Sequence, residues 1–504
     1  MRTMESLSSS PTTGRSSTAT PTPIISLPAE IWLLVFSIGE FDDYGNFWST
    51  YDHRTMANLC RCCTLFCDLV RPRLYYNFES MIFTNRWHYY NVDKFTRTVC
   101  ENRELASMVR RLDIQGVLHI EQLMGPSTVA PADVPCDHPA SVFTQRAAEL
   151  GLNFRFYQRR KIYVKGQNDF DHVALLLAQL PRLHTLYLYW FDHGHPIRPS
   201  ISEPRGSWPW VDSIRNMVLR PCGEPVPFGQ YGSPSRHSPF TINHSFTVPN
   251  TLLWDVRNLT SLSLTDSIGP RCALPLGSLL ELILDHCQCL DDELVNLLKH
   301  CTRLRKFVYR ASPDASQATP PSPRAVIQAL GPAHKTLETL GIAFFDVQGL
   351  DGLPRITSLK QFTALRTLYI DVNALWDRHL ADNTGSPPNP DMVFTTALPE
   401  SVEDLALFCL DGFGQRLGFR VEVHLKRLAI DRREKGAFPH LKTLRGKALS
   451  PLEHCLLDEL LADLRRRHAV LEEVTTLLSN GGLEVILSER DDSCLEFEDL
   501  IPFS

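Results

Sequence analysis

The sequence predicts an α/β fold: a small helical N-terminal unit, followed by a solenoid of parallel strands with helices on its outer side. Three observations predict it. A short apolar motif recurs along most of the chain, segments of helical character lie between its copies, and an amphipathic segment begins abruptly after a polar tail. The chain has 504 residues, 43% of them hydrophobic and 21% charged, which suits a globular protein with a sizeable core.

Residues 1–23 are rich in Ser, Thr and Pro and contain almost no apolar side chains. Such a segment cannot bury enough surface to offset its conformational entropy, so we expect a disordered tail. The helical unit is predicted over 24–78 and opens with SLPAEIWLLVFSI, in which Pro28 suits the first position of a helix. Apolar residues three and four positions apart then form one stripe, made of Ile31, Leu34, Val35 and Ile38.

A second helix is predicted in RTMANLCRCCTLFCDLVRP, residues 54–72. Its apolar stripe consists of Met56, Leu59, Cys63, Phe66 and Val70. Two helices of this size have little interior of their own, so their apolar side chains stay partly exposed until a partner covers them. The sequence therefore predicts an attachment unit near the N-terminus.

Between this unit and an acidic C-terminal tail (491–504), residues 79–490 repeat one motif. The motif has six residues, of which the first, fourth and sixth are apolar. The last two apolar positions alternate, as in a short strand with one buried face. Copies occur at VRRLDI (109–114), LHTLYL (183–188), LTSLSL (259–264), LLELIL (279–284), LRKFVY (304–309), LETLGI (337–342), LRTLYI (365–370), VEDLAL (402–407) and LKRLAI (425–430), with weaker copies at IRNMVL (214–219) and LKTLRG (441–446).

From residue 259 onward, successive copies start 20 to 37 residues apart, and the longest intervals contain Pro-rich insertions at 311–324 and 381–391. Helix-like segments, DDELVNLLKHC (291–301) and AVIQALGPAHK (325–335), lie between copies. Leucine-rich repeats have about 20–29 residues each. This alternation predicts an irregular leucine-rich-repeat solenoid with parallel strands on its concave face and helices outside. An ordinary α/β sheet with coincidental leucines is the alternative.

The stretches LPAEIWLLVF and CCTLFCDLVRPRLY together resemble the F-box, in the form common in fungal proteins. The resemblance covers roughly a tenth of the chain. Phe36 and Cys63 stand 27 positions apart, more than the family usually has, so 39–52 reads as an insertion. It either forms a harmless loop or obstructs the docking face. The matching positions are Leu27, Pro28, Glu30, Ile31, Val35, Phe36, Cys63, Phe66, Leu74 and Tyr75.

The resemblance implies docking on a Skp-type adaptor, which links an F-box protein to a cullin scaffold and a ubiquitin-conjugating module. The repeats are then expected to hold a protein substrate. The mechanism is proximity, because the receptor raises the effective concentration of a substrate lysine near the charged ubiquitin carrier. The adaptor-binding positions carried over from the family are Leu27, Pro28, Ile31, Val35, Phe36, Leu59 and Cys63.

Strand phase predicts which side chains the concave face presents. Residues after the second and third apolar positions of the motif point away from the core. Exposed aromatic side chains beside carboxylates suit a partner with basic and apolar groups. The alternative is an ordinary solvated sheet face, or one that contacts the long loops. The substrate-binding candidates are Tyr187, Tyr189, Asp285, Tyr369, Asp371 and Asp431.

Other function classes find little support in the sequence. Net charge is −6 and no Lys/Arg block indicates a nucleic-acid partner. No phosphate-binding Gly loop, GxSxG or HExxH motif occurs, so we expect no catalytic residue and no cofactor. Cys60, Cys62, Cys63 and Cys67 cluster in CRCCTLFC, but no second Cys/His pair follows at zinc-finger spacing. We interpret them as small apolar core residues and expect no metal.

The fourteen cysteines are few for this length, and neither a secretory start nor a run of eighteen apolar residues is visible. We therefore expect free thiols in a reducing compartment, cytoplasmic or nuclear, and no membrane span. The leading hypothesis is the substrate receptor of a Skp–cullin–F-box ubiquitin ligase. The alternatives are a repeat scaffold that binds a partner without ubiquitin transfer, and an enzyme with an unfamiliar site.

Overall fold

The computed structural model contains two compact units, Met1–Leu74 and Tyr75–Ser504. The tails predicted at the two ends, 1–23 and 491–504, lie outside the described residues. These are Trp32 and 53–81, 89–115, 140–151, 173, 175–190, 209–221, 246–247, 256–265, 267–268, 276–287, 289–311, 321–344, 353–375, 394–410, 417–449, 472, 475–479 and 482–488.

The first unit contains two consecutive helices, α2 (His53–Cys62) and α3 (Thr64–Leu74). The prediction of one helix over 54–72 is wrong at Cys63, which separates the two, and Pro72 lies inside α3. Cys63 acts as a cap, because its sulfur accepts the Phe66 N–H at 3.5 Å. Trp32 is helical, and its ring meets Phe66 edge-to-face with 4.9 Å between centroids. This contact joins the first predicted helix to α3.

The second unit contains a 12-stranded sheet in which every neighbouring pair is parallel and strand order follows chain order. The α/β fold with parallel strands is therefore confirmed. The short strands β5 (Phe246–Thr247) and β7 (Ser267–Ile268) form a separate pair. The strands of the large sheet are β1 (Asn77–Met81), β2 (Arg111–Gln115), β3 (Thr185–Trp190), β4 (Asn216–Pro221), β6 (Ser261–Thr265), β8 (Glu281–Cys287), β9 (Lys306–Ala311), β10 (Thr339–Ala343), β11 (Thr367–Asp371), β12 (Asp404–Leu410), β13 (Thr443–Leu449) and β14 (Glu484–Ser488).

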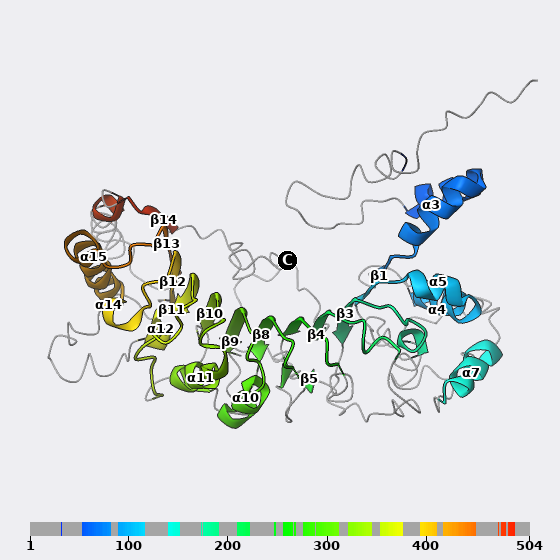
Figure 1. The fold of residues 1–504 in the computed structure, drawn as a ribbon, viewed down its shortest axis with the longest axis horizontal. Helices are drawn as coiled ribbons and strands as arrows, with labels where there is room; N and C mark the ends of the chain where they lie inside the picture. The colour runs from blue at the N-terminus through cyan, green and yellow to red at the C-terminus, as the bar shows by residue number, and fades with distance from the viewer. Residues whose placement is uncertain are drawn as a thin grey trace, which may run out of the picture. The chain divides into compact units, whose positions relative to one another are not determined.

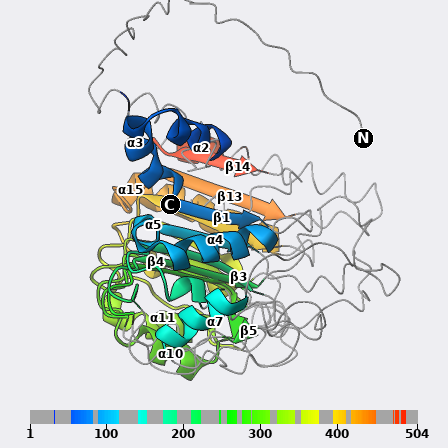
Figure 2. The same ribbon diagram turned by 90° about the vertical axis from the view of Figure 1, so that its right-hand side faces the viewer.

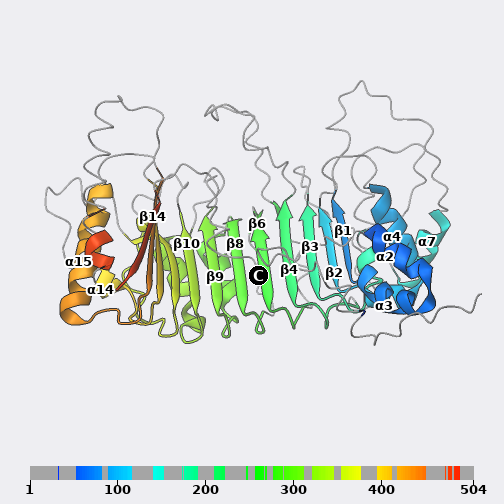
Figure 3. The same cartoon turned by 90° about the horizontal axis from the view of Figure 1, so that it is seen from above.

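Within this unit the strands follow one another along an arc, with α10 and α11 on its outer side (Figure 1). The arrows of β1, β3 and β13 point the same way in Figure 2, and Figure 3 shows the strands side by side. This is a solenoid-like arrangement. The helices of the unit are α4 (Tyr89–Glu101), α5 (Arg103–Met108), α7 (Ala140–Glu149), α10 (Asp291–Leu298), α11 (Pro323–Ala329), the 3-10 turn η1 (Gly331–Ala333), α12 (Val372–Leu375), α14 (Phe394–Ala397) and α15 (Leu417–Lys435).

Each strand of the large sheet from β2 to β13 is preceded by the same pair of backbone hydrogen bonds. The carbonyl of the residue before one strand accepts two consecutive N–H groups from the next turn, as the Arg305 carbonyl does from Glu338 (2.7 Å) and Thr339 (2.8 Å). This repetition fixes the register, because every turn docks on the one before it. The accepting carbonyls belong to Tyr76, Arg110, His184, Arg215, Thr260, Leu280, Arg305, Glu338, Arg366 and Glu403.

One continuous hydrophobic core runs through the turns of the sheet unit. The first apolar position of the motif lies just before each strand and is fully buried, as at Leu279, Leu304 and Leu337. The second and third positions point from the strand to the same side, as Leu282 and Leu284 do in β8. Stacked turns therefore cover one another's leucines, which a single turn cannot do alone.

Both helices predicted between strands are present as α10 and α11, and their starts follow from the sequence. Three acidic residues, Asp291, Asp292 and Glu293, fill the first turn of α10, where negative charge suits the helix dipole. Before α11, the Ser322 side chain accepts the Ala325 N–H at 3.1 Å, and a proline occupies the first helical position.

One predicted strand is wrong: LKRLAI (425–430) lies inside α15. Its buried residues Leu425, Leu428 and Ala429 stand three and four positions apart, which is the spacing of a helix face. The first two apolar positions of the strand motif are also three residues apart, so the motif fits a helix as well as a strand. The weaker copy at 441–446 supplies β13 instead. At the other end, the sheet begins at Asn77, so 77–78 belong to β1 and not to the helical unit predicted over 24–78.

Candidate functional site

The candidate site lies on the open face of the sheet, which we define as the face opposite the hydrophobic core. Parallel register aligns its side chains in three rows that cross the strands. In β8 these rows contain Glu281, Ile283 and Asp285, and in β9 they contain Lys306, Val308 and Arg310. Each acidic residue of β8 thus stands beside a basic residue of β9, with an apolar pair between the two.

The apolar pair is buried although it lies on the open face. Ile283 is 4% exposed and Val308 is 1% exposed, and they form a cluster separate from the main core. Tyr369 of β11 packs against this cluster. Gly341 lies between Val308 and Tyr369 in the register and has no side chain that blocks the contact. We call Glu281, Ile283, Asp285, Lys306, Val308, Arg310 and Tyr369 the central patch.

Two ion pairs flank the apolar cluster. Lys306 Nζ lies 2.6 Å from Glu281 Oε1, and the second oxygen of Glu281 accepts the Ser261 hydroxyl at 2.9 Å. On the other side, Arg310 Nη1 lies 3.7 Å from Asp285 Oδ1. The Glu281–Lys306 pair is thus closely hydrogen-bonded, while the Asp285–Arg310 pair is longer than a hydrogen bond.

A β-bulge shapes the patch at Asp285. The register between β8 and β9 shifts between Leu284 and Cys287, and His286 adopts φ 51°. This left-handed conformation is uncommon for a residue with a Cβ. The bulge brings His286 Nδ1 to 3.8 Å from Asp285 Oδ1, so His286 and Arg310 flank one carboxylate. Bulges commonly re-aim side chains in this way at binding surfaces.

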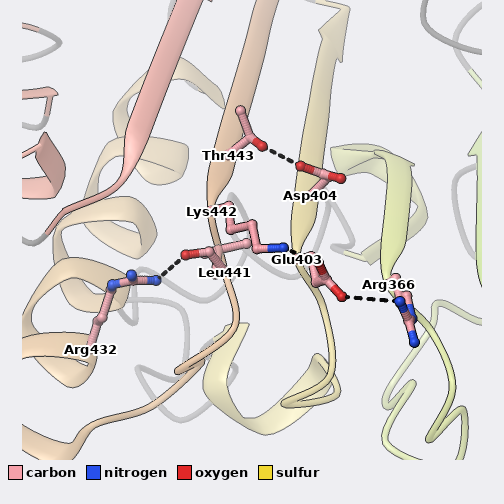
Figure 4. Close-up of polar contacts among 7 residues, drawn as sticks. All are labelled: Arg366, Glu403, Asp404, Arg432, Leu441, Lys442 and Thr443. Atoms are coloured by element: carbon pink, nitrogen blue, oxygen red, sulfur yellow. Dashed lines mark hydrogen bonds and ion pairs between the residues drawn. The ribbon is translucent and has the colours of Figure 1, made fainter.

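Toward the C-terminal end, the open face carries a half-buried phenol near charged groups. Burial raises the pKa of Tyr369, while the nearby Arg445 opposes that shift and Asp404 adds to it. The Asp404 carboxylate also accepts a hydrogen bond from the Thr443 hydroxyl (Figure 4). The raised pKa favours the protonated phenol of Tyr369, whose hydroxyl is able to donate a hydrogen bond to a partner.

The strand entrances near this end are joined by charged side chains. Figure 4 shows Glu403 between Arg366 Nη1, 3.6 Å away, and the ammonium group of Lys442. The hydrogen bond from Lys442 lowers the pKa of Glu403. Arg432 of α15 donates to the Leu441 carbonyl at 2.6 Å. These contacts fasten β11, β12 and β13 to one another, and we interpret them as structural.

Asp371 was expected to be exposed on the concave face, and that expectation is wrong. The residue is fully buried, and its Oδ2 accepts the N–H of Phe344 at 3.0 Å. Phe344 directly follows β10, so its backbone N–H lies beyond the hydrogen bonds of the sheet. The carboxylate thus satisfies a buried backbone group, which explains an acidic residue at the end of β11.

Asp431 is not on the open face either, because it belongs to α15. It is 1% exposed, and its carboxylate lies 3.1 Å from Arg427 Nε and 2.8 Å from Lys435 Nζ. Both partners are one helical turn away, so the three residues form a ladder along α15. The sequence pattern predicted a strand at 425–430, so Asp431 was expected beside a strand, whereas it lies in a helix.

Tyr187 lies on the open face, half-buried, with the Arg111 guanidinium 4.5 Å from its ring centroid. In the register of β3 and β4, Tyr189 pairs with Arg220. Three strand positions separate β3 from β8, or about 14 Å at about 4.8 Å per strand. Tyr369 is also three strand positions from β8, but it packs against the Ile283–Val308 cluster. The structure therefore places Asp285 and Tyr369 in the central patch, whereas Tyr187 and Tyr189 belong to β3 outside it.

Glu281 and Lys306, which flank the apolar pair of the patch, were not among the residues predicted from the sequence. They occupy the position just before the second apolar residue of the motif, one row away from the two rows that were considered. The signal was present, because alternation along a strand places residues two apart on one face. The bulge at His286 has no such signal in the sequence.

In the first unit, only part of the predicted docking surface is among the described residues. Leu59 and Cys63 are partly exposed, and Leu65 of α3 is 47% exposed. The only buried apolar residues described there are Met56 and Val70. The predicted insertion at 39–52 is outside the described residues. So are five predicted adaptor-binding positions, Leu27, Pro28, Ile31, Val35 and Phe36.

The described residues contain no group of three or more His, Cys, Asp or Glu side chains that could hold a metal ion. Cysteines whose side chains are described are free thiols, and burial next to Cys67 raises the pKa of Cys60. No helix in the described part of the chain is long and apolar enough to cross a membrane. No family model matches the chain, and no curated protein matches it.

Proposed function

We propose that this chain is the substrate receptor of a Skp–cullin–F-box ubiquitin ligase, with an F-box in the first unit and irregular leucine-rich repeats in the second. The first unit docks on a Skp-type adaptor, and the open face of the sheet holds a protein substrate. The chain supplies proximity rather than catalysis, so the gain in rate comes from effective concentration.

The observation that carries this proposal is the incomplete burial of α2 and α3. Leu65 is 47% exposed, Leu59 and Phe66 are only partly covered, and two apolar side chains are buried. Apolar surface left open on a unit this small is typical of a docking element. The family resemblance, carried by residues such as Leu27 and Pro28, assigns a Skp-type adaptor to that surface.

The open face supports the second half of the proposal. A solenoid presents one extended surface built from short strands, and such surfaces bind proteins in many repeat families. The central patch offers Tyr369, which packs against the Ile283–Val308 cluster, and the Asp285–Arg310 pair, in which Asp285 is 9% exposed. This mixture of aromatic and charged groups resembles interface anchors. This composition suits a protein substrate better than a small molecule, which needs a concave pocket.

Paired variants with equal starting exposure test the docking surface. Leu65→Asp places a charge on α3, and we expect adaptor recovery in a pull-down to fall at least about tenfold, because a buried unpaired charge opposes association. Leu290→Asp is the matched control, since Leu290 is also 47% exposed but belongs to the sheet unit. Equal recovery with both variants would remove α3 from the docking surface.

A deletion separates the receptor from a scaffold without ubiquitin transfer. Affinity purification of the tagged chain, with and without residues 24–76, should lose both the adaptor and the cullin when the segment is absent. Leu27→Ala with Pro28→Ala should reproduce that loss while the sheet unit stays folded. Recovery of an adaptor without any cullin would favour the scaffold, and unchanged recovery of the adaptor would contradict the docking claim.

A further inference from the structure

Strand β14 ends the described sheet with an open edge. It is the last strand in the sheet order, and among the described strands it pairs only with β13. The Glu484 N–H donates to the Lys442 carbonyl at 2.9 Å, so it points toward β13. Because backbone groups alternate along a parallel strand, the N–H groups of Val485 and Leu487 point away from β13. These donors face the open edge.

Within the described residues 482–488, this edge lacks the sequence features that usually protect one. Natural edges carry Lys or Pro, are bent by a bulge, or are very short. The sequence of β14, EVILS, has five residues and neither a basic residue nor a proline. Ile486 at its centre is 45% exposed, and Leu477, which precedes the strand, is 36% exposed. An unprotected apolar edge of this kind is a site for strand pairing.

The strand is nevertheless held in place. Leu478 and Leu483 are 1% and 3% exposed, and Val485 packs against the main core. Gly482 supplies φ 73° at the turn before the strand, where residues with a Cβ are strained. The edge is therefore preorganised, so a binding segment does not have to order it first.

Charge near the edge selects the partner. In the register, Ile486 stands beside Arg445, which is exposed. Glu484 is the single acidic residue of β14 and lies at its other end. A segment with an apolar residue opposite Ile486 and carboxylates toward Arg445 complements both features.

We propose that β14 binds an extended acidic segment of another protein as an added strand of the sheet. Main-chain hydrogen bonds to Val485 and Leu487 supply the pairing, and Ile486 and Arg445 select the side chains. This surface is distinct from α2 and α3, so the inference does not depend on adaptor docking.

The probe is a fluorescently labelled peptide, acetyl-EVEIEVE-amide, titrated into the full-length protein and followed by fluorescence anisotropy. The charge-reversed peptide KVKIKVK is its control. We expect the acidic peptide to bind at least about tenfold more tightly than the basic one. Arg445→Glu should reduce or reverse that preference. Equal affinities for the two peptides on the unaltered protein would overturn the proposal.

A second pair of variants tests the main-chain bonds. Leu487→Pro removes an outward N–H, whereas Leu487→Ala removes the same side chain and keeps the N–H. Binding of the acidic peptide should weaken about tenfold more in the proline variant. Equal loss in both variants contradicts strand addition, provided that their urea unfolding midpoints agree.

Two other occupants of the edge give distinct results, and either result overturns the proposal. A dimer detected by light scattering that dissociates in Leu487→Pro would show that a second copy occupies β14. A chain ending at Ser488 that binds the peptide at least about tenfold more tightly than the full chain would show that residues 489–504 occupy it.

Discussion

Helix α10 of the sheet unit and the helices α2 and α3 of the first unit differ in how many of their apolar residues are buried. In α10, eight residues bury three leucines, Leu294, Leu297 and Leu298. In α2 and α3, which have ten and eleven residues, only Met56 and Val70 are buried among the described side chains. Among the described side chains, α10 thus buries most of its apolar residues in the core, while α2 and α3 leave most of theirs partly exposed. This difference is what a division into a self-supporting platform and a docking element requires.

The contrast also concerns how each unit is held together. In the sheet unit, every turn of the large sheet from β2 to β13 repeats the same carbonyl bonding and a similar set of buried apolar residues. Its stability is therefore approximately a sum over turns and the contacts between neighbours. The described part of the helical unit, Trp32 and 53–74, has no such repetition, so single contacts such as that between Trp32 and Phe66 carry more of its stability.

The largest effect is expected from a core leucine at the centre of the sheet. Leu340 of β10 is fully buried, and Leu340→Ala should lower the free energy of unfolding by about 2–5 kcal/mol, from lost burial and the cavity left behind. Urea unfolding followed by circular dichroism measures it. A loss below about 1 kcal/mol would show that the core is looser than the contrast with α2 and α3 assumes.

A smaller loss is expected at Asp371. Replacing it by alanine removes the acceptor of the Phe344 N–H and should cost about 1–3 kcal/mol, because a buried donor is left without a partner. Asp371→Asn keeps an acceptor of similar shape and serves as the control. Urea midpoints of the two variants should differ, with the alanine variant less stable. Equal stabilities would contradict the structural role of this carboxylate.

Leu65→Ala should change the stability of the helical unit by no more than about 0.5 kcal/mol, because its side chain is already 47% exposed. The same substitution at Leu294 in α10 is the matched comparison, since that side chain is fully buried and should cost about 2–5 kcal/mol. Thermal unfolding of both variants compares them. A large loss at Leu65 would mean that this surface is packed within the chain and is not open for docking.

The repeating motif predicts most of the sheet because its physical cause is local. A leucine before the strand and two alternating apolar residues within it are enough to specify a turn, as at LETLGI, which forms β10. The central patch is partly predictable for the same reason. Alternation placed Asp285 and Tyr369 on the open face, and the same rule extended by one row finds Glu281 and Lys306.

The motif fails where the deciding contacts are distant in sequence. Asp371 is buried because Phe344, 27 positions away, needs an acceptor. LKRLAI is helical because Leu425, Leu428 and Ala429 meet the core along one helix face, a choice that the shared three-residue interval leaves open. β14 carries no copy of the motif, since a terminal strand needs only one neighbour.

The smallest predicted effect concerns pH and the strand entrances of the sheet unit. Burial lowers the pKa of His184, and the adjacent Arg110 and Arg215 lower it further. The unfolded chain, with a histidine pKa of about 6.5, therefore binds more protons than the folded one at mildly acidic pH. The stability that this group contributes is complete above that value and is lost as pH falls toward the lower pKa of the folded state.

Urea midpoints measured between about pH 5 and 7.5 should rise with pH, and His184→Gln should reduce the slope. Arg110→Gln removes one neighbouring charge and should reduce it less. An unchanged slope in His184→Gln would assign the pH dependence to other groups.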